Sequence, residues 1–158
     1  VSDGVRVLNL AQVQAQYEDW FERLYALNCA LVVDLPAPDP VVPESRVCFA
    51  VRFDRPGFLA EGFFVAMDGD HPVGMSTLNG SLSSPERLHT GLTGVRREYR
   101  RRGVCTALKV GALCWAKRRG YARVDTDNEA NNPMYGINLA LGFEPLPSFI
   151  VFHAGVSA

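Results

Sequence analysis

The sequence lacks the patterns that mark several classes of protein. It contains no apolar run long enough to cross a membrane, no CxxC pair, and no metal-ligand spacing of its histidines or cysteines. It also lacks the phosphate-binding motifs GxxxxGK and GxGxxG. These absences argue against a membrane span, a thiol redox motif, a metal centre, a P-loop and a dinucleotide-binding fingerprint.

The cysteines are few, and they lie in otherwise apolar segments, at Cys29, Cys48, Cys105 and Cys114. This pattern predicts reduced, buried thiols and a cytoplasmic protein. The first ten residues show no basic region followed by an apolar one, so we expect no signal peptide. They also lack an initiator Met, which leaves open that the chain is one half of a tandem protein.

Length and composition are those of one globular domain. The chain has 158 residues, of which 47% are hydrophobic and 21% charged, so it can bury a core without disulfides or metals. We therefore expect a single domain over residues 1–158.

Positive charge is concentrated in one segment, although the net charge is only −1. Ten of the sixteen Lys and Arg residues fall between Arg96 and Arg123, where Glu98 is the only acid. Five of the seven residues 96–102 are arginine. Such a segment indicates either an anionic partner or a solvated basic face.

Hydrophobic periodicity predicts the elements of the first half. We expect a strand at 5–10, a helix over 13–31, and strands at 62–67 and 72–80 that form a hairpin. Residues 46–58 are ambiguous, because Val47, Phe49, Val51 and Phe53 alternate as in a strand. We interpret this segment as a buried helix that ends at Pro56 and Gly57.

The second half alternates strands with helices. A strand over 88–95 contains Gly91 and Gly94, which indicate a bulge or a close ligand. A helix over 103–119 and a strand over 121–127 follow. Asn132 and Pro133 then open a short helix that Gly142 ends, and one or two strands are expected within 143–152. This order predicts an α/β domain with a mixed sheet.

The junction of the strand at 88–95 and the next helix has the features of a phosphate-binding loop. The N-terminus of a helix presents unpaired N–H groups and a partial positive charge. Gly103 permits a nest of amides, and Thr106 places a hydroxyl in the first turn. The arginines before Gly103 add charged donors. We therefore predict a phosphate site there.

The residues from Arg100 to Cys105 resemble the Q/R-x-x-G-x-G/A loop of the GNAT superfamily (GCN5-related N-acetyltransferases), with Cys105 in place of the last Gly or Ala. Downstream, Asn131 is followed by a helix and by Leu141-Gly142-Phe143, which is similar to another signature of the family. The resemblance implies a GNAT-like fold, with about six to seven strands in a mixed sheet and about four flanking helices. It is strongest over residues 88–145.

The resemblance also implies acetyl-CoA as cofactor. Backbone groups near Val95 would bind the pantetheine arm, amides from Arg101 to Thr106 would bind the pyrophosphate, and the arginines would screen its charge. The implied cofactor contacts are Val95, Arg97, Arg100, Arg101, Arg102, Gly103, Val104, Cys105, Thr106, Asn131 and Asn138. Cys105 is expected to serve packing rather than nucleophilic attack.

Two residues are candidates for proton transfer. His89 lies six residues before Val95, and an imidazole can act as a base near neutral pH; a solvent-facing strand histidine is the alternative. Asn138 occupies the position of the tyrosine that is the usual acid in the family. An amide cannot give up a proton to a thiolate, so Tyr135, one turn earlier, is the candidate acid. Packing under the last strands is its alternative role.

The resemblance implies an acetyl-CoA-dependent N-acetyltransferase that transfers acetyl directly to a primary amine of a small molecule or peptide. The alternative is an acyl-CoA-binding module without catalysis. Nucleic acid is not the expected partner of the basic segment, because this segment holds only one aromatic residue, Tyr99. The acidic remainder of the chain weakly favours a cationic acceptor. Oligomeric state stays open, and a homodimer is compatible with the sequence.

Overall fold

The computed structural model describes residues 4–35, 40–128 and 132–147. Its strands are β1 (Val5–Asn9), β2 (Phe58–Asp68), β3 (His71–Gly80), β4 (Arg87–Val95) and β5 (Arg123–Asp125). Its helices are α1 (Leu10–Gln16), α2 (Trp20–Val32), α3 (Arg46–Val51), α4 (Val104–Arg118) and α5 (Met134–Ala140), with short 3₁₀ helices η1 (Arg52–Asp54) and η2 (Arg97–Tyr99).

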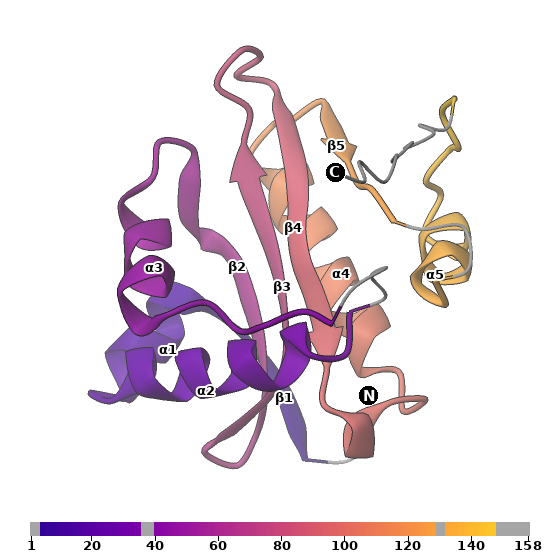
Figure 1. The fold of residues 1–158 in the computed structure, drawn as a ribbon. Coiled ribbons are helices and arrows are strands. Elements are labelled where there is room, and N and C mark those ends of the chain that lie inside the picture. Colours follow the sequence, from indigo (N-terminus) through magenta and orange to yellow (C-terminus); the bar gives the residue numbers. More distant parts are fainter. Residues whose placement is uncertain (1–3, 36–39, 129–131, 148–158) are drawn as a thin grey trace, which may run out of the picture.

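The described strands form one mixed sheet in chain order, β1-β2-β3-β4-β5. The first four pair antiparallel, and β5 pairs parallel with β4. The parallel pair requires a crossover, and α4 supplies it. Figure 1 shows α2 and α3 in front of the sheet and α4 behind it.

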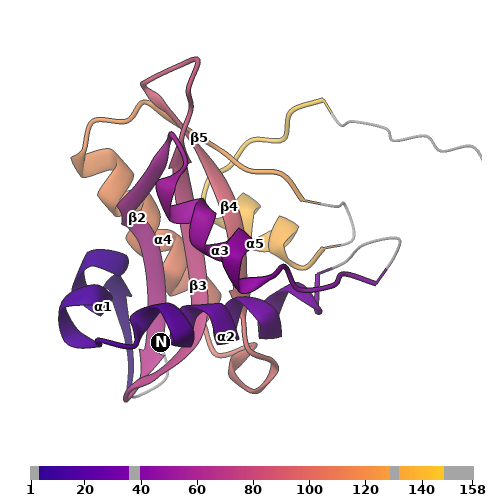
Figure 2. The same cartoon turned by 60° about the vertical axis from the view of Figure 1, so that its left-hand side comes forward.

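Each face of the sheet has its own core cluster. On one face, α4 packs with Trp115 and Leu108 against Phe64 and Leu88. On the other face, α1, α2 and α3 contribute Leu10, Leu24 and Phe49, which pack against strand residues such as Val65 and Met75. The sheet is therefore buried between two helical layers (Figure 2).

The helix predicted over residues 13–31 is wrong as a single element, because the chain forms two helices there. Asn9 and Gln12 make a reciprocal capping box that starts α1 earlier, at Leu10. Tyr17 is then extended, with φ −132°, which ends α1. The second helix, α2, begins after Asp19, whose carboxylate pairs with Arg23 at 2.6 Å.

Other predicted elements differ mainly in their bounds. The segment interpreted as a helix is α3, capped by the Ser45 hydroxyl, which accepts from the Cys48 amide. Asn132 accepts from the Met134 amide at 2.9 Å and so caps α5 as predicted. The predicted strand over 121–127 shrinks to the three residues of β5. Residues 143–147 form no strand, and residues 148–152 lie outside the described part.

The prediction of buried thiols is wrong for two cysteines. Cys48 and Cys114 are exposed, whereas Cys29 and Cys105 are half-buried. All four are free thiols.

Candidate functional site

The strands β4 and β5 separate soon after they meet. Their register joins only Arg87–Arg123, Leu88–Val124 and His89–Asp125. Beyond His89, β4 continues to Val95 with β3 on one side and, within the described residues, no strand on the other. Figure 1 shows β5 turning away from β4. One edge of β4 over residues 90–95 is thus available to an extended ligand.

A bulge in β4 lies at the start of this edge. The register steps from Ser76–Thr93 to Leu78–Thr90, so Gly91 and Leu92 together face Thr77. A Cβ atom at Gly91 would lie 2.3 Å from the Thr77 hydroxyl oxygen, so only glycine fits there. This confirms the bulge that the strand glycines predicted.

The loop after β4 presents unpaired amides at the start of α4. Arg101 and Gly103 both adopt positive φ, 62° and 76°. No side chain caps the helix. Within the described residues, the amides of Val104, Cys105 and Thr106 donate to no backbone or side-chain acceptor. Amides converging at the N-terminus of a fifteen-residue helix form an anion-binding cradle, which we call the amide cradle (residues 101–106).

Asp34, just beyond α2, binds two of the arginines predicted to screen phosphate. Both Asp34 oxygens accept from Arg97 Nε at 3.0 Å, and Arg100 donates to the same carboxylate. Arg100 also donates through Nε to the Val95 carbonyl at 3.1 Å. These contacts join the end of α2 to the start of the amide cradle. Sequence analysis missed Asp34, because it lies more than sixty residues from its partners.

The arginines hold the pKa of the Asp34 carboxyl at about 2, below its ordinary value of 3.8; the hydrogen bond from Arg97 is the main cause and that from Arg100 the next. Because the folded state lowers this pKa, Asp34 stabilises the fold above pH 4 and loses that contribution as the pH falls towards 2. We expect Asp34→Asn to lower the urea midpoint at pH 7. The difference from the wild type should shrink between pH 4 and pH 2.

A series of urea unfolding curves at pH 7, 4 and 2 would measure this effect. The matched control is Asp54→Asn, since the Asp54 carboxylate makes no ion pair within the described residues. A wild-type advantage that stayed constant down to pH 2 would show that the ion pairs of Asp34 contribute nothing to stability.

Arg101 and Arg102 are exposed and lie within the amide cradle. The Arg101 side chain makes no ion pair with any described residue. The Arg102 guanidinium lies 5.2 Å from the centre of the Tyr99 ring. Tyr99 is itself fixed, because its hydroxyl donates to Asp68 at 2.6 Å. Arg97 and Arg100 are therefore bound by Asp34, whereas Arg101 and Arg102 belong to the amide cradle.

Cys105 links the cradle to α5. Its sulfur lies 3.5 Å from the Met134 sulfur, and burial raises the pKa of its thiol. The group therefore stays a neutral thiol at pH 7, which favours the packing role over nucleophilic attack.

The candidate groups for proton transfer lie on β4 and α5. His89 is exposed and stands in register between Asn79 of β3 and Asp125 of β5. Tyr135 is 42% exposed on α5. Asn138 is buried; its amide donates to Asn128 at 2.8 Å, while its oxygen has no partner within the described residues. Tyr135 and Asn138 thus lie in different surroundings, and Asn131 lies outside the described part.

A pocket of about 320 Å³ opens on the face that carries α3, and we call it the aromatic pocket. It meets β4 at the bulge. Its lining comes from α3, η1, β2, β3 and β4: Phe49, Arg52, Phe53, Arg55, Pro56, Phe58, Phe63, Met75, Thr77, Leu78, Asn79, Gly91 and Leu92. The pocket could not be predicted from the sequence, because its lining combines residues of five elements and of the segment between η1 and β2. The repeated phenylalanines between 49 and 63 were its only local signal.

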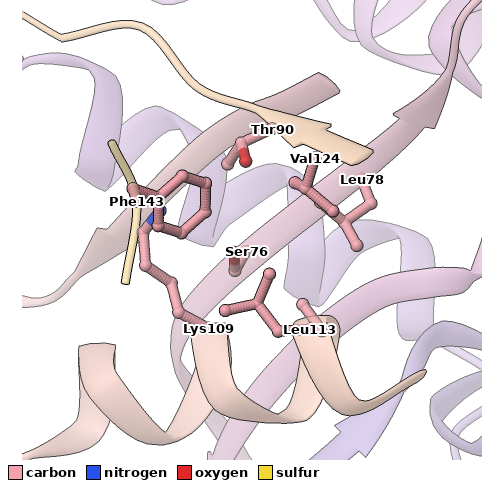
Figure 3. A pocket seen from close by; sticks show the side chains of 8 residues that line it. Ser76, Leu78, Thr90, Lys109, Leu113, Val124 and Phe143 are labelled. Carbon is pink, nitrogen blue, oxygen red and sulfur yellow. The ribbon is translucent and has the colours of Figure 1, made fainter. Parts of the chain in front are cut away.

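A buried lysine lies on the opposite face. Lys109 of α4 is 3% exposed, and its ammonium lies 5.2 Å from the centre of the Phe143 ring. Figure 3 shows this side chain rising from α4 beside a cavity of about 10 Å³. Among the described residues, no carboxylate pairs with it. Burial lowers its pKa.

The described residues hold neither a candidate membrane span nor a candidate metal cluster. No helix there combines the length and the apolar character needed to cross a membrane. No three His, Cys, Asp or Glu side chains there gather closely enough to hold a metal ion.

Comparisons with known proteins identify the class that the separated strands and the amide cradle define. A family model described as the acetyltransferase (GNAT) family matches residues 29–143. The chain therefore belongs to the GNAT acetyltransferase family and has its α/β fold. The cofactor of this family is acetyl-CoA. A search among curated proteins finds no significant match.

Solved structures with this fold include one acetyltransferase named for a ribosomal protein and two named for aminoglycosides. The ribosomal-protein-S18-alanine N-acetyltransferase from Escherichia coli superposes with a TM-score of 0.67 at 16% identity, over 90% of this chain and 79% of that one. The aminoglycoside N-acetyltransferase AAC(6')-Iy, solved with CoA, gives 0.65 at 20% identity, covering 95% and 93%. AAC(6')-Ih from Acinetobacter baumannii gives 0.63 at 21%, covering 98% and 100%.

Proposed function

We propose that this chain is an acetyl-CoA-dependent N-acetyltransferase that transfers the acetyl group directly to a primary amine of a small molecule or peptide. The observation that carries the proposal is the continuity of the open β4 edge with the amide cradle. An extended pantetheine arm suits the edge at residues 90–95, and a pyrophosphate suits the unpaired amides that follow. The aromatic pocket meets the same strand at Gly91, where an acceptor could enter.

The cofactor supplies an activated acetyl group as a thioester. In our proposal, the amides of Gly103, Val104, Cys105 and Thr106 hold its pyrophosphate. Arg101 and Arg102 lie beside that charge, whereas Arg97 and Arg100 act with Asp34 to fix the loop. Val95 ends the edge that binds the pantetheine arm, and a backbone N–H near it polarises the acetyl carbonyl.

His89 is the proposed general base. Leu88 packs in the core cluster with α4 and Thr90 lines the small cavity beside α4, so the alternation of a strand places His89 on the face of the aromatic pocket. Its register partner Asn79 lines that pocket. A base there could take the proton of an incoming ammonium.

The acid is proposed to come from α5. The exposed Tyr135 phenol can donate a proton, while the Asn138 oxygen, buried without a partner, can accept a hydrogen bond from a departing thiol. Tyr135 would then be the acid, and Asn138 a positioning residue. Because Met134 contacts Cys105, both residues lie on a helix that packs beside the amide cradle.

The test is thiol release from acetyl-CoA with a panel of primary amines, together with a binding isotherm for CoA. We expect release with at least one amine. In His89→Gln, kcat/KM should fall at pH 7 by about tenfold to a hundredfold, because a positioned base contributes about 10²–10⁴-fold and water relays offset part of the loss.

His71→Gln is the matched control, because His71 is exposed at the start of β3 and does not line the aromatic pocket. Tight CoA binding with no release for any amine would instead support an acyl-CoA-binding module without catalysis.

A further inference from the structure

The aromatic pocket carries positive charge and no negative charge. Among the described residues, Arg52 and Arg55 are the only charged residues in its lining, and no Asp or Glu contributes to it. We propose that its occupant is an amine with an apolar or aromatic body and an anionic group, such as a carboxylate, at the end remote from the amine. This inference rests on the proposed function, since it names the acceptor class of that reaction.

Of the two arginines, Arg55 is the one whose charge remains available. The Arg52 guanidinium binds Glu44 through two contacts, at 2.6 Å and 3.1 Å, so its charge is largely compensated. Glu44 also accepts from Asn28 at 3.2 Å, which fixes this pair. The exposed Arg55 side chain makes no ion pair or hydrogen bond within the described residues. A carboxylate on a ligand is its natural partner.

Phenylalanine rings that pack against one another line the body of the pocket. The Phe53 ring lies 5.3 Å from that of Phe49 and 5.2 Å from that of Phe58, both edge to face. It stacks parallel to Phe63 at 6.4 Å. Edge-to-face and offset arrangements are those that aromatic rings prefer, so a flat apolar ring suits this lining. A volume of about 320 Å³ accommodates one substituted ring.

The polar groups lie where the pocket meets the sheet. Thr77 and Asn79 of β3 and the bulge at Gly91 supply a hydroxyl, an amide and open backbone. Since His89 stands beside Asn79, the amine should face this end. Arg55 belongs instead to the segment between η1 and β2, and it would meet the far end of the ligand.

The charge of the pocket also opposes cationic acceptors. The uncompensated guanidinium of Arg55 favours the neutral form of a bound amine, which is the form that can attack a thioester. A polyamine or an aminoglycoside carries several further ammonium groups that would find no carboxylate in the lining. The pocket therefore favours the opposite of the cationic acceptor expected from overall charge, and a different acceptor from those named for AAC(6')-Iy and AAC(6')-Ih.

The experiment compares three amines that share one ring and differ only in the para group. They are para-(aminomethyl)benzoate, para-methylbenzylamine and para-bis(aminomethyl)benzene, whose para groups are anionic, neutral and cationic. We expect kcat/KM to be highest for the benzoate, about threefold to tenfold above the neutral amine, and lowest for the diamine.

Variants at Arg55 identify the group responsible. Arg55→Gln should bring the benzoate and the neutral amine to equal kcat/KM, and Arg55→Glu should favour the diamine. Arg118→Glu is the matched control, because Arg118 is exposed near the end of α4 and outside the pocket; it should preserve the wild-type order. An unchanged affinity for CoA in Arg55→Glu would show that the variant is folded.

The possible failures are distinguishable. Equal kcat/KM for the three amines, a preference for the diamine, or turnover of other amines but none of these would overturn the inference and leave the N-acetyltransferase standing. If no amine were turned over, yet calorimetry showed that the benzoate binds and that Arg55→Glu weakens it, the proposed function would fail and the inference about the pocket would stand. Absence of both binding and turnover would overturn the inference as well.

Discussion

Replacing Lys109 by methionine should raise the free energy of unfolding at pH 7 by about 1–3 kcal/mol, since exchanging buried charge for well-packed apolar groups often stabilises by such amounts. The side chain is 3% exposed and faces the Phe143 ring. Its cavity of about 10 Å³ has room for about one water molecule. Methionine has a similar length, and its flexible thioether can fill the same space without a charge.

The effect should depend on pH with a definite sign. Burial lowers the pKa of Lys109, so between that lowered value and the ordinary 10.5 the unfolded chain binds a proton that the folded chain does not. Stability of the wild type therefore rises with pH in this window. Its deficit relative to Lys109→Met should be largest at pH 7 and smaller at pH 9.5.

Urea unfolding at both pH values would measure the deficit. Lys117→Met is the matched control, because Lys117 is exposed in the last turn of the same helix. It should change stability by less than about 0.5 kcal/mol. Equal effects of the two substitutions would contradict the assignment of a buried, uncompensated cation at position 109.

The features best predicted from the sequence are those that depend on residues close together in the chain. The amide cradle follows from Gly103, the arginines before it and the helix after it, all within a few residues. The N-terminal cap of α5 follows from Asn132 and Pro133 in the same way. The break between α1 and α2 was missed because the apolar spacing continues across it, while the deciding contacts are the side-chain cap at Asn9 and the ion pair of Asp19 with Arg23.

Features that join distant segments could not be predicted. The ion pairs of Asp34 with Arg97 and Arg100 span more than sixty residues. The aromatic pocket needs the bulge of β4 to meet α3 and η1. The burial of Lys109 could have been predicted from the sequence. Cys105, Ala112 and Ala116 lie four, three and seven residues away from it, so helical spacing places Lys109 on the buried face of the helix.

Charged residues that are neighbours in the sequence have different surroundings in the folded chain. The basic segment includes arginines that bind Asp34, arginines beside the amide cradle, and a lysine inside the core. The aromatic pocket carries its own arginine, Arg55, which a count of net charge does not reveal. The net charge of the chain therefore does not predict the charge of the amide cradle or of the aromatic pocket. The position of each charged group decides what it can bind.

Replacing Gly103 by valine should weaken CoA binding by about thirtyfold to a hundredfold. Gly103 holds φ at 76° as it starts α4, in a region where a β-branched residue is strongly disfavoured. Relief of that strain must shift the neighbouring amides away from the cradle. A hydrogen bond to a charged group contributes about 1.5–3 kcal/mol, so losing one of those proposed for the amides of Val104 to Thr106 gives an effect of this size.

The other end of the same helix supplies the control. Gly120 also has positive φ, 81°, and a Cβ there would meet no atom within 4 Å. Gly120→Val therefore imposes similar backbone strain on α4 without touching the cradle. Both variants should lose similar stability in urea, whereas calorimetry with CoA should show the large loss of affinity only for Gly103→Val. Similar affinities in the two variants would mean that the amides at the start of α4 do not hold the pyrophosphate.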